Sequence, residues 1–196
     1  GVKKKLFPLL FGIIIIAAFF ERVIPSLNNN FYFTIDQGND AVQVREIIER
    51  GQVLLKGPET DISGLHAGSL WYYFIAIGYK LSDGNPLGAL LVIITLNVFT
   101  LGLIMWVVAK RVSKLWGILI GTALCVSWWF FDTARYAFNP FLLVPLSFAL
   151  MFLLADFAEG KKKNFALAAI PIGLGFHVEI AGSMALLLFY LLVGLW

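Results

Sequence analysis

The segment FYFTIDQGNDAVQVREIIERG, residues 31–51, decides how the rest of the chain is arranged. It is the one long polar and charged stretch in a sequence that is otherwise mostly hydrophobic. It carries two aspartates four residues apart, Asp36 and Asp40. We expect the surrounding apolar segments to be helices that hold these two acids at a membrane surface.

The composition on either side of this segment indicates an integral membrane protein. Hydrophobic residues make up 60% of the 196 residues and charged residues only 14%, and the mean hydropathy is +0.85. About 25% of residues are charged in soluble domains. We therefore expect an all-α, multi-span helical bundle. The net charge of +3 comes from short basic clusters between apolar runs, which is typical of membrane topology, so no nucleic-acid partner is expected.

Apolar runs predict six membrane spans, near residues 6–24, 86–109, 115–131, 140–157, 164–176 and 180–196. A bilayer core requires about 20 helical residues, so several runs must include flanking residues. The last run is too long for one helix and is interrupted by Pro171 and His177, which predicts two helices meeting near His177. Because the sequence starts without methionine and stops inside an apolar run, we interpret residues 1–196 as the N-terminal part of a longer transmembrane domain.

Charge asymmetry predicts the orientation in an inner (plasma) membrane. With a cytoplasmic N-terminus, the inner ends of the spans receive nine of the 15 basic residues and two of the 12 acids, in agreement with the positive-inside rule. The polar residues of the loop 25–85 and of the later outer turns then all lie on the extracytoplasmic side. Any active site is expected there.

The loop 25–85 is longer than a helix connection requires, which is typical of functional loops. Apolar residues recur at helical spacing after Asn39–Asp40 and stop at Gly51, which predicts a helix lying along the interface. A second interfacial helix is expected over residues 69–81. Its aromatic residues suit the lipid headgroup boundary: Trp71, Tyr72, Tyr73 and Tyr79.

Both aspartates have a structural and a functional interpretation. Asp40 and Gln43 fit a capping box that opens the helix. Asp36 does not occupy a capping position of the predicted helix. It is either a general base that accepts a proton from an attacking hydroxyl or amine, or simply a solvated acid. Arg135 is either a phosphate ligand or an interfacial arginine. His177 and Glu179 interrupt an apolar run, which marks them as functional candidates, or they only reach the outer interface.

No zinc-like ligand spacing is found among the acids, His66 and His177, so no metal site is predicted. The alternative class is a polytopic transporter with a broken helix around residues 171–179. Against it, the ionisable residues gather outside the spans, whereas a transporter is expected to carry them near mid-span.

Several motifs in this order resemble the start of the GT-C membrane glycosyltransferases, namely the bacterial relatives of the protein O-mannosyltransferases and of the lipid A aminoarabinose transferase. They are the Asp-containing FTIDQGND after the first span, GPETDISG, SLWYYF, RYAFNP at the outer end of the third span, and FHVE opening the sixth. The better-known relatives have two adjacent acids after the first span, whereas here Gln37 follows Asp36.

The resemblance implies an inverting hexosyl or pentosyl transferase at the extracytoplasmic face. The donor would be a polyprenyl-phosphate sugar, and the acceptor a lipid, a glycan or a protein in contact with membrane lipid. It implies Asp36 as the general base, with Asp40 positioning the acceptor. Substrate contacts would come from Arg135, His177, Glu179 and His66, and no cofactor is certain, although a divalent cation is possible.

Overall fold

The computed structural model describes residues 2–60 and 62–195, and helices make up 77% of the chain. Gly1, Asp61 and Trp196, the last residue of the predicted sixth span, lie outside the described residues. The helical elements in chain order are α1 (Val2–Val23), η1 (Ile24–Asn29), α2 (Ile35–Arg50), α3 (Leu70–Leu81), α4 (Pro86–Arg111), α5 (Lys114–Val126), α6 (Trp128–Asp132), η2 (Asn139–Leu142), α7 (Leu143–Ala158), α8 (Lys163–Leu167), α9 (Ala169–Phe176) and α10 (Ile180–Leu195). Two short antiparallel strands, β1 (Lys56–Glu59) and β2 (His66–Gly68), form a hairpin between α2 and α3.

Within the described residues, three helical stretches are long and apolar enough to cross a membrane: Leu6–Asn28, Pro86–Arg111 and Asn139–Ala158. The other apolar helices are shorter: Lys114–Val126, Lys163–Phe176 and Ile180–Leu195. One of these, Lys114–Val126, is followed by another helix after a break, and another, Lys163–Phe176, is itself divided into two helices. Ser127 ends α5 and caps α6, and α8 gives way to α9 at Ala168 because Pro171 cannot donate the backbone hydrogen bond that would continue the helix.

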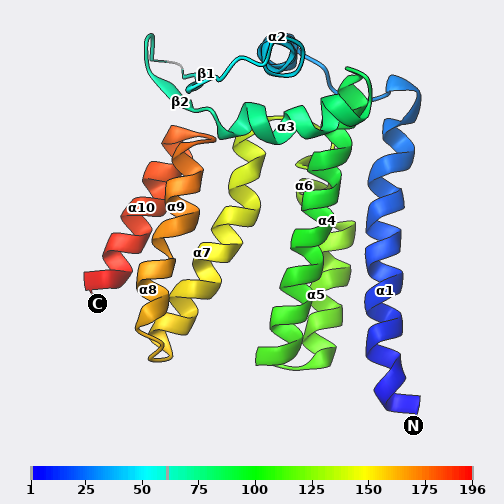
Figure 1. Ribbon diagram of the computed structural model, residues 1–196. Coiled ribbons are helices and arrows are strands. Elements are labelled where there is room, and N and C mark those ends of the chain that lie inside the picture. Colours follow the sequence, from blue (N-terminus) through cyan, green and yellow to red (C-terminus); the bar gives the residue numbers. More distant parts are fainter. Residues whose placement is uncertain (1, 61, 196) are drawn as a thin grey trace.

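The long helices stand side by side, and α2, the hairpin and α3 lie crosswise at one end of them (Figure 1). We call these four elements, residues 35–81, the cap. Gly51 ends α2 in the left-handed conformation, with φ of 64°, as the sequence predicts. The predicted start near Asn39–Asp40 is wrong, because α2 begins at Ile35, one turn earlier.

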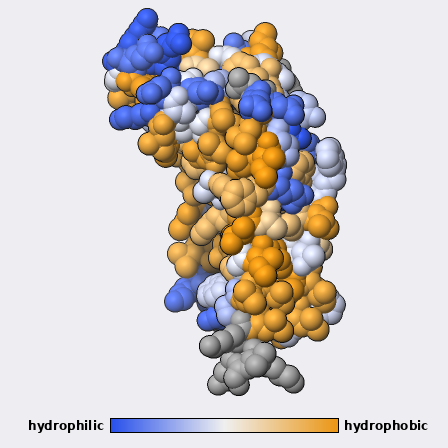
Figure 2. Space-filling model, turned by 90° about the vertical axis from the view of Figure 1, so that its right-hand side faces the viewer, coloured by the Kyte–Doolittle hydropathy of each residue, from blue (hydrophilic) through white to orange (hydrophobic). Residues whose placement is uncertain are grey.

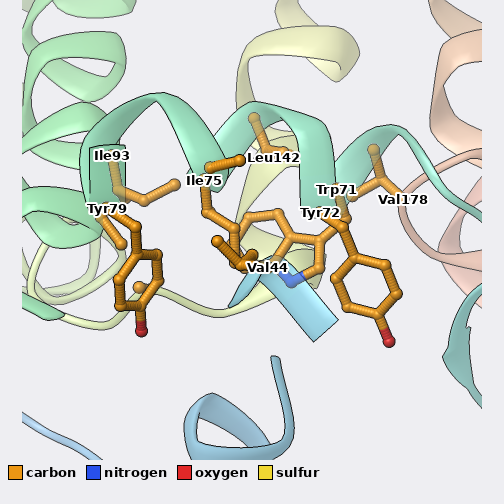
Figure 3. Packing of buried hydrophobic residues seen from close by; sticks show 11 residues of the cluster. Val44, Trp71, Tyr72, Ile75, Tyr79, Ile93, Leu142 and Val178 are labelled. Atoms are coloured by element: carbon orange, nitrogen blue, oxygen red, sulfur yellow. The ribbon is translucent and has the colours of Figure 1, made fainter. Parts of the chain in front are cut away.

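The core of the cap explains a second difference from the sequence analysis. Trp71, Tyr72 and Tyr79 were expected at the lipid boundary, but all three side chains are buried. They pack against Val44 of α2 and, on the side of the bundle, against Ile93 of α4 (Figure 3). The aromatic side chains therefore bind the cap to the bundle, since burying them removes a large apolar area from solvent.

The join between α3 and α4 is tight because glycines allow the two backbones to touch. A Cβ atom at Gly78 would overlap the carbonyl group of Gly88, and one at Gly88 would overlap that of Gly78. Asn85 caps α4 by accepting a hydrogen bond from the Leu87 N–H at 2.9 Å, and Pro86 occupies the first turn. The cap is thus held at a fixed angle over α4.

On the face shown in Figure 2, much of the bundle surface is hydrophobic, and the largest hydrophilic patch lies at the cap end. At the opposite end, Asp156 of α7 binds Arg111 of α4, Lys161 and Asn164. This polar cluster ties the end of α4 to α7. The predicted meeting of two helices near His177 agrees with the structure, because α9 ends at Phe176 and α10 begins at Ile180.

Candidate functional site at the cap end

A cavity of about 590 Å³ lies where the cap meets η2 and the start of α10. Its lining includes four carboxylates, from Asp36, Asp40, Glu59 and Glu179. Apolar side chains complete the walls: Ile62, Leu65, Tyr72, Phe138 and Pro140. The segments that supply this lining are far apart in the sequence, so only the packing of the cap onto the bundle creates the cavity.

Asp36 and Asp40 reach the same cavity because residues four apart lie on one side of a helix. Asp36 is exposed in the first turn of α2, where the helix dipole favours an acid. Asp40 lies one turn further along and is only 7% exposed. Its Oδ2 accepts a hydrogen bond from Trp71 Nε1 at 2.7 Å.

The environment of Asp40 changes its proton affinity. Burial raises the pKa of Asp40 to about 6, the Trp71 hydrogen bond lowers it in part, and the charge of Asp36 adds to the rise. Burial and the nearby Asp40 charge also raise the pKa of Tyr72 and Tyr79 to about 12, so both hydroxyls stay protonated. A buried carboxylate that titrates close to neutral pH beside a cavity is typical of acid–base sites.

The predicted capping box at Asp40 and Gln43 is wrong, because Asp40 sits inside α2. The helix starts after Thr34, whose backbone N–H donates to Gln37 Oε1 at 2.7 Å. Gln37 holds the third helical position, which is where a capping box places its amide or carboxylate. Thr34 and Gln37 therefore cap α2, and the buried position of Asp40 is not due to helix capping.

The other two acids of the cavity wall are bound to backbone N–H groups. Glu59 Oε1 accepts from Gly64 N–H at 2.7 Å and closes the hairpin loop. Glu179 accepts from the N–H groups of Ala181 and Gly182, at 2.8 and 2.5 Å, and so caps α10. The predicted substrate contact Glu179 therefore lies in the cavity wall but also has a structural task.

The remaining predicted contacts, His66, His177 and Arg135, do not line this cavity. His66 lies between Leu65 and Ala67, which both line it, and alternation along a strand directs the His66 ring to the other face, with Nδ1 3.2 Å from the Gly57 carbonyl oxygen. His177 packs against the hairpin, because a Cβ at Gly68 would overlap its ring.

Arg135 has a structural role in the loop that follows α6. Its Nη2 donates to the carbonyl oxygen of Asn30 at 3.0 Å, and its guanidinium lies 5.5 Å from the centre of the Phe131 ring. These contacts fasten the loop to the segment between η1 and α2. Arg135 is thus a neighbour of the cavity wall and not part of it.

Within the described ranges 2–60 and 62–195, no lysine, arginine or histidine lines the cavity, and no three His, Cys, Asp or Glu side chains are grouped to hold a metal ion. The described lining therefore suits hydroxyl or amino groups, which donate hydrogen bonds to carboxylates. It offers no counter-charge to a phosphate.

A second, apolar groove of about 480 Å³ runs along the junction of α3 and α4. Phe74 and Leu81 of α3 and Leu91, Val92 and Phe99 of α4 contribute to its walls. Phe99 is 65% exposed, so the groove opens on the hydrophobic side of α4. Its shape and lining suit a hydrocarbon chain.

The sequence analysis gave no role to Arg22, which is fully buried between α1, α4 and α6. Its Nε donates to Asn97 Oδ1 at 3.0 Å, and its Nη1 donates to the Ala18 carbonyl oxygen at 3.0 Å. Asn97 Nδ2 in turn donates to the Phe130 carbonyl oxygen and to Thr133 Oγ1, at 3.0 and 3.3 Å. Position 22 sits at the end of a predicted span, where an arginine usually reaches water, so sequence alone gave no signal of its burial.

Comparison of the chain with known protein families, with curated proteins and with solved structures found no match. We therefore infer the function from the geometry of the cap and from the sequence motifs.

Proposed function

We propose that this chain belongs to a GT-C type membrane glycosyltransferase. In this proposal the enzyme moves a sugar from a polyprenyl-phosphate donor to an acceptor hydroxyl or amine at the extracytoplasmic face. The observation that carries the proposal is the pair Asp36 and Asp40 on one face of α2, beside a cavity of about 590 Å³, with the pKa of Asp40 raised to about 6. The charge of Asp36 contributes to this rise, so the two carboxylates are coupled, and a perturbed pair of acids beside a cavity is typical of acid–base sites.

The placement in a membrane is supported by the distribution of side chains along the bundle. Basic residues gather at the end opposite the cap, where α4 ends and α8 begins: Lys110, Arg111, Lys114 and Lys161 to Lys163. By the positive-inside rule this end faces the cytoplasm. Exposed tryptophans mark two levels of the bundle: Trp106 and Trp116 near the basic end, and Trp128 and Trp129 in α6. The cap then lies at the outer membrane surface.

The proposed reaction forms one bond and breaks one. The acceptor oxygen or nitrogen attacks the anomeric carbon of the sugar, and the bond from that carbon to the phosphate oxygen breaks with its electron pair leaving on the polyprenyl phosphate. Asp36, which is exposed to the cavity, accepts the acceptor's proton. Attack opposite the leaving group inverts the anomeric centre, and Asp40 holds the acceptor through a second hydrogen bond.

In this proposal the donor lipid lies outside the acidic cavity. The apolar groove between α3 and α4 is lined by hydrocarbon side chains and opens on a face that we place in the bilayer. The phosphate itself requires cations, which the described lining of the cavity does not supply. In this proposal the phosphate is bound at the edge of the cavity by groups outside that lining.

The transporter alternative depended on a broken helix around residues 171–179. The break between α9 and α10 lies at the cap end, where the chain reverses direction (Figure 1). It therefore forms a turn between two antiparallel helices, whereas transport sites lie near mid-span.

The test is transfer of labelled sugar from polyprenyl-phosphate donors by membranes carrying the protein. Asp36→Asn is expected to reduce turnover by at least about a hundredfold, since an amide cannot accept the proton. Asp40→Asn is expected to reduce it less. Asp83→Asn is the matched control, because Asp83 is an exposed acid outside this cavity whose left-handed backbone, with φ of 50°, asparagine also adopts.

Full activity in Asp36→Asn would remove Asp36 from the role of base. Absence of transfer by well-folded wild-type protein with every donor tested would reject the glycosyltransferase proposal.

A further inference from the structure

We propose that Gln37 is a positioning residue that fixes the rotation of α2, and with it the direction of Asp36 and Asp40. The inference that this rotation matters for turnover rests on the proposed function. The inference that Gln37 fixes α2 rests on the contacts of its side chain alone.

The buried face of α2 consists mainly of polar side chains. The buried residues of this helix are Gln37, Asp40 and Val44, which follow one another at helical spacing. Gln37 is 3% exposed and Asp40 is 7% exposed. Apolar burial does not depend on direction, whereas hydrogen bonds do, so the rotation of α2 about its axis is set by the partners of these two polar side chains.

The Gln37 side chain acts as donor and acceptor at once. Its Oε1 accepts from the backbone N–H and the hydroxyl of Thr34, at 2.7 and 2.8 Å. Its Nε2 donates to the Ala137 carbonyl oxygen at 3.1 Å. An amide makes both kinds of bond, but an ionised carboxylate only accepts. A glutamate at position 37 would turn a negative oxygen toward the Ala137 carbonyl oxygen.

The partner loop, residues 133–138, is itself anchored to the bundle. Thr133 Oγ1 donates to the Phe130 carbonyl oxygen at 2.9 Å, and both groups also bind Asn97 Nδ2 of α4. Next to the Gln37 contact, Tyr136 OH lies 3.0 Å from Thr34 Oγ1. The Gln37 side chain therefore fixes the first turn of α2 to a loop that α4 holds in place.

This arrangement gives a reason for the glutamine that follows Asp36. Gln37 faces the loop, so it belongs to the support of the site and not to its lining. The two acids that face the cavity are instead one helical turn apart. Losing the Gln37 bonds would let α2 rotate and would displace both carboxylates together.

Two variants separate this role from a general loss of folding. Gln37→Glu keeps the shape, and its carboxyl group can replace the amide only when it is protonated, which burial favours by raising its pKa. Gln37→Met is uncharged and removes both kinds of bond at every pH. Gln43→Glu is the matched control, because Gln43 lies on the same helix and makes no side-chain hydrogen bond within residues 2–60 and 62–195.

The measurement is kcat and KM for sugar transfer at about pH 6 and about pH 8, each divided by the wild-type value at the same pH. Division by wild type removes the pH dependence that variant and wild type share, and Gln37→Met shows the effect without a new charge near Asp36, Asp40, Arg135 and Tyr136. We expect kcat of Gln37→Glu to fall at least about tenfold at the higher pH and to recover at the lower, because small misplacements cost rate steeply. Gln37→Met should lose a similar factor at both.

Backbone hydrogen exchange of residues 34–44 is followed in the same samples and does not depend on activity. Faster exchange in Gln37→Glu at the higher pH only, with Gln43→Glu unchanged, supports the inference even if no donor is ever transferred. Exchange and kcat ratios that match those of Gln43→Glu at both pH values would overturn it.

Discussion

Two buried charged side chains, Arg22 in the bundle and Asp40 in the cap, differ in what surrounds them. Arg22 is sealed among α1, α4 and α6 and donates to Asn97 and to the Ala18 carbonyl oxygen. Its guanidinium also lies 5.8 and 5.6 Å from the centres of the Phe130 and Phe131 rings. Asp40 accepts a hydrogen bond from Trp71 and borders a cavity.

The comparison separates a structural charge from one that is available for chemistry. A sealed ion with a partner on another helix fixes the packing of these helices, because the hydrogen bond from Arg22 to Asn97 is lost if α1 and α4 move apart. An acid that is buried on one side and open to a cavity on the other retains capacity to exchange a proton with a ligand. The predictions below test this difference in the order of their expected size.

The largest effect is expected from Asn97→Leu. This change removes the Asn97 hydrogen bond from the buried Arg22, while the ion pair of Arg22 with Glu21 at 3.5 Å remains, and it costs about 3 kcal/mol of unfolding free energy. Thermal unfolding in detergent measures the loss. The double variant Arg22→Met with Asn97→Leu should regain part of it, because an apolar pair needs no hydrogen bonds. Equal stability of Asn97→Leu and wild type would show that Arg22 is not held as described.

Asp40→Asn is expected to act in the opposite direction on stability. The folded-state pKa of Asp40, about 6, lies above its ordinary value of 3.8, so the folded protein binds the proton more tightly than the unfolded chain does. The wild type therefore loses stability as the pH rises from about 4 to about 6, by on the order of 2 kcal/mol, and stays at the lower level above that.

The asparagine variant lacks this loss, since its uncharged amide oxygen still accepts from Trp71. Melting temperatures across this pH range should show Asp40→Asn above wild type at about pH 8, together with lower transfer activity. If the stability of the wild type and that of Asp40→Asn depended on pH in the same way, the raised pKa of Asp40 would be contradicted.

The smallest effect is expected from Trp71→Phe, which keeps an aromatic ring at position 71 and removes the donor to Asp40. The cost is about 1–2 kcal/mol, because the carboxylate loses its one hydrogen bond among the described residues. The Trp71 bond lowers the pKa of Asp40, so its removal raises that pKa further. In this variant the acidic limb of the pH–activity profile should move to higher pH. If the limb does not move, the protonation of Asp40 does not control the rate of transfer.

The two helices of the cap could largely be predicted from the sequence, whereas the hairpin of β1 and β2 was not, since an all-α fold was expected. Apolar spacing and Gly51 gave the second half of α2, and the run 69–81 gave α3. The start of α2 was misplaced because Asp40 and Gln43 match a capping pattern as well as Thr34 and Gln37 do. Choosing between them depends on the loop 133–138, about a hundred residues further along, which engages Gln37.

The contacts of the site were less predictable than its location. The sequence analysis selected Asp36, Asp40 and Glu179, which the fold brings to one cavity, and also His66, His177 and Arg135, which face elsewhere. Trp71 was expected at the lipid headgroup boundary because amphipathic aromatic side chains collect there. Its burial under α2 follows from the packing of two crosswise helices, which no local pattern encodes.

The sequence by itself determined the helical class, the long apolar stretches and the concentration of acids in one segment, because these depend on composition and on spacing within single helices. Only the tertiary structure decided which polar side chains are buried, and therefore which of them carry altered proton affinity. Burial of Arg22, Gln37 and Asp40 depends on partners in distant segments. The physical reason is that desolvation and hydrogen bonding depend on distances in space, which are set only when the cap packs on the bundle.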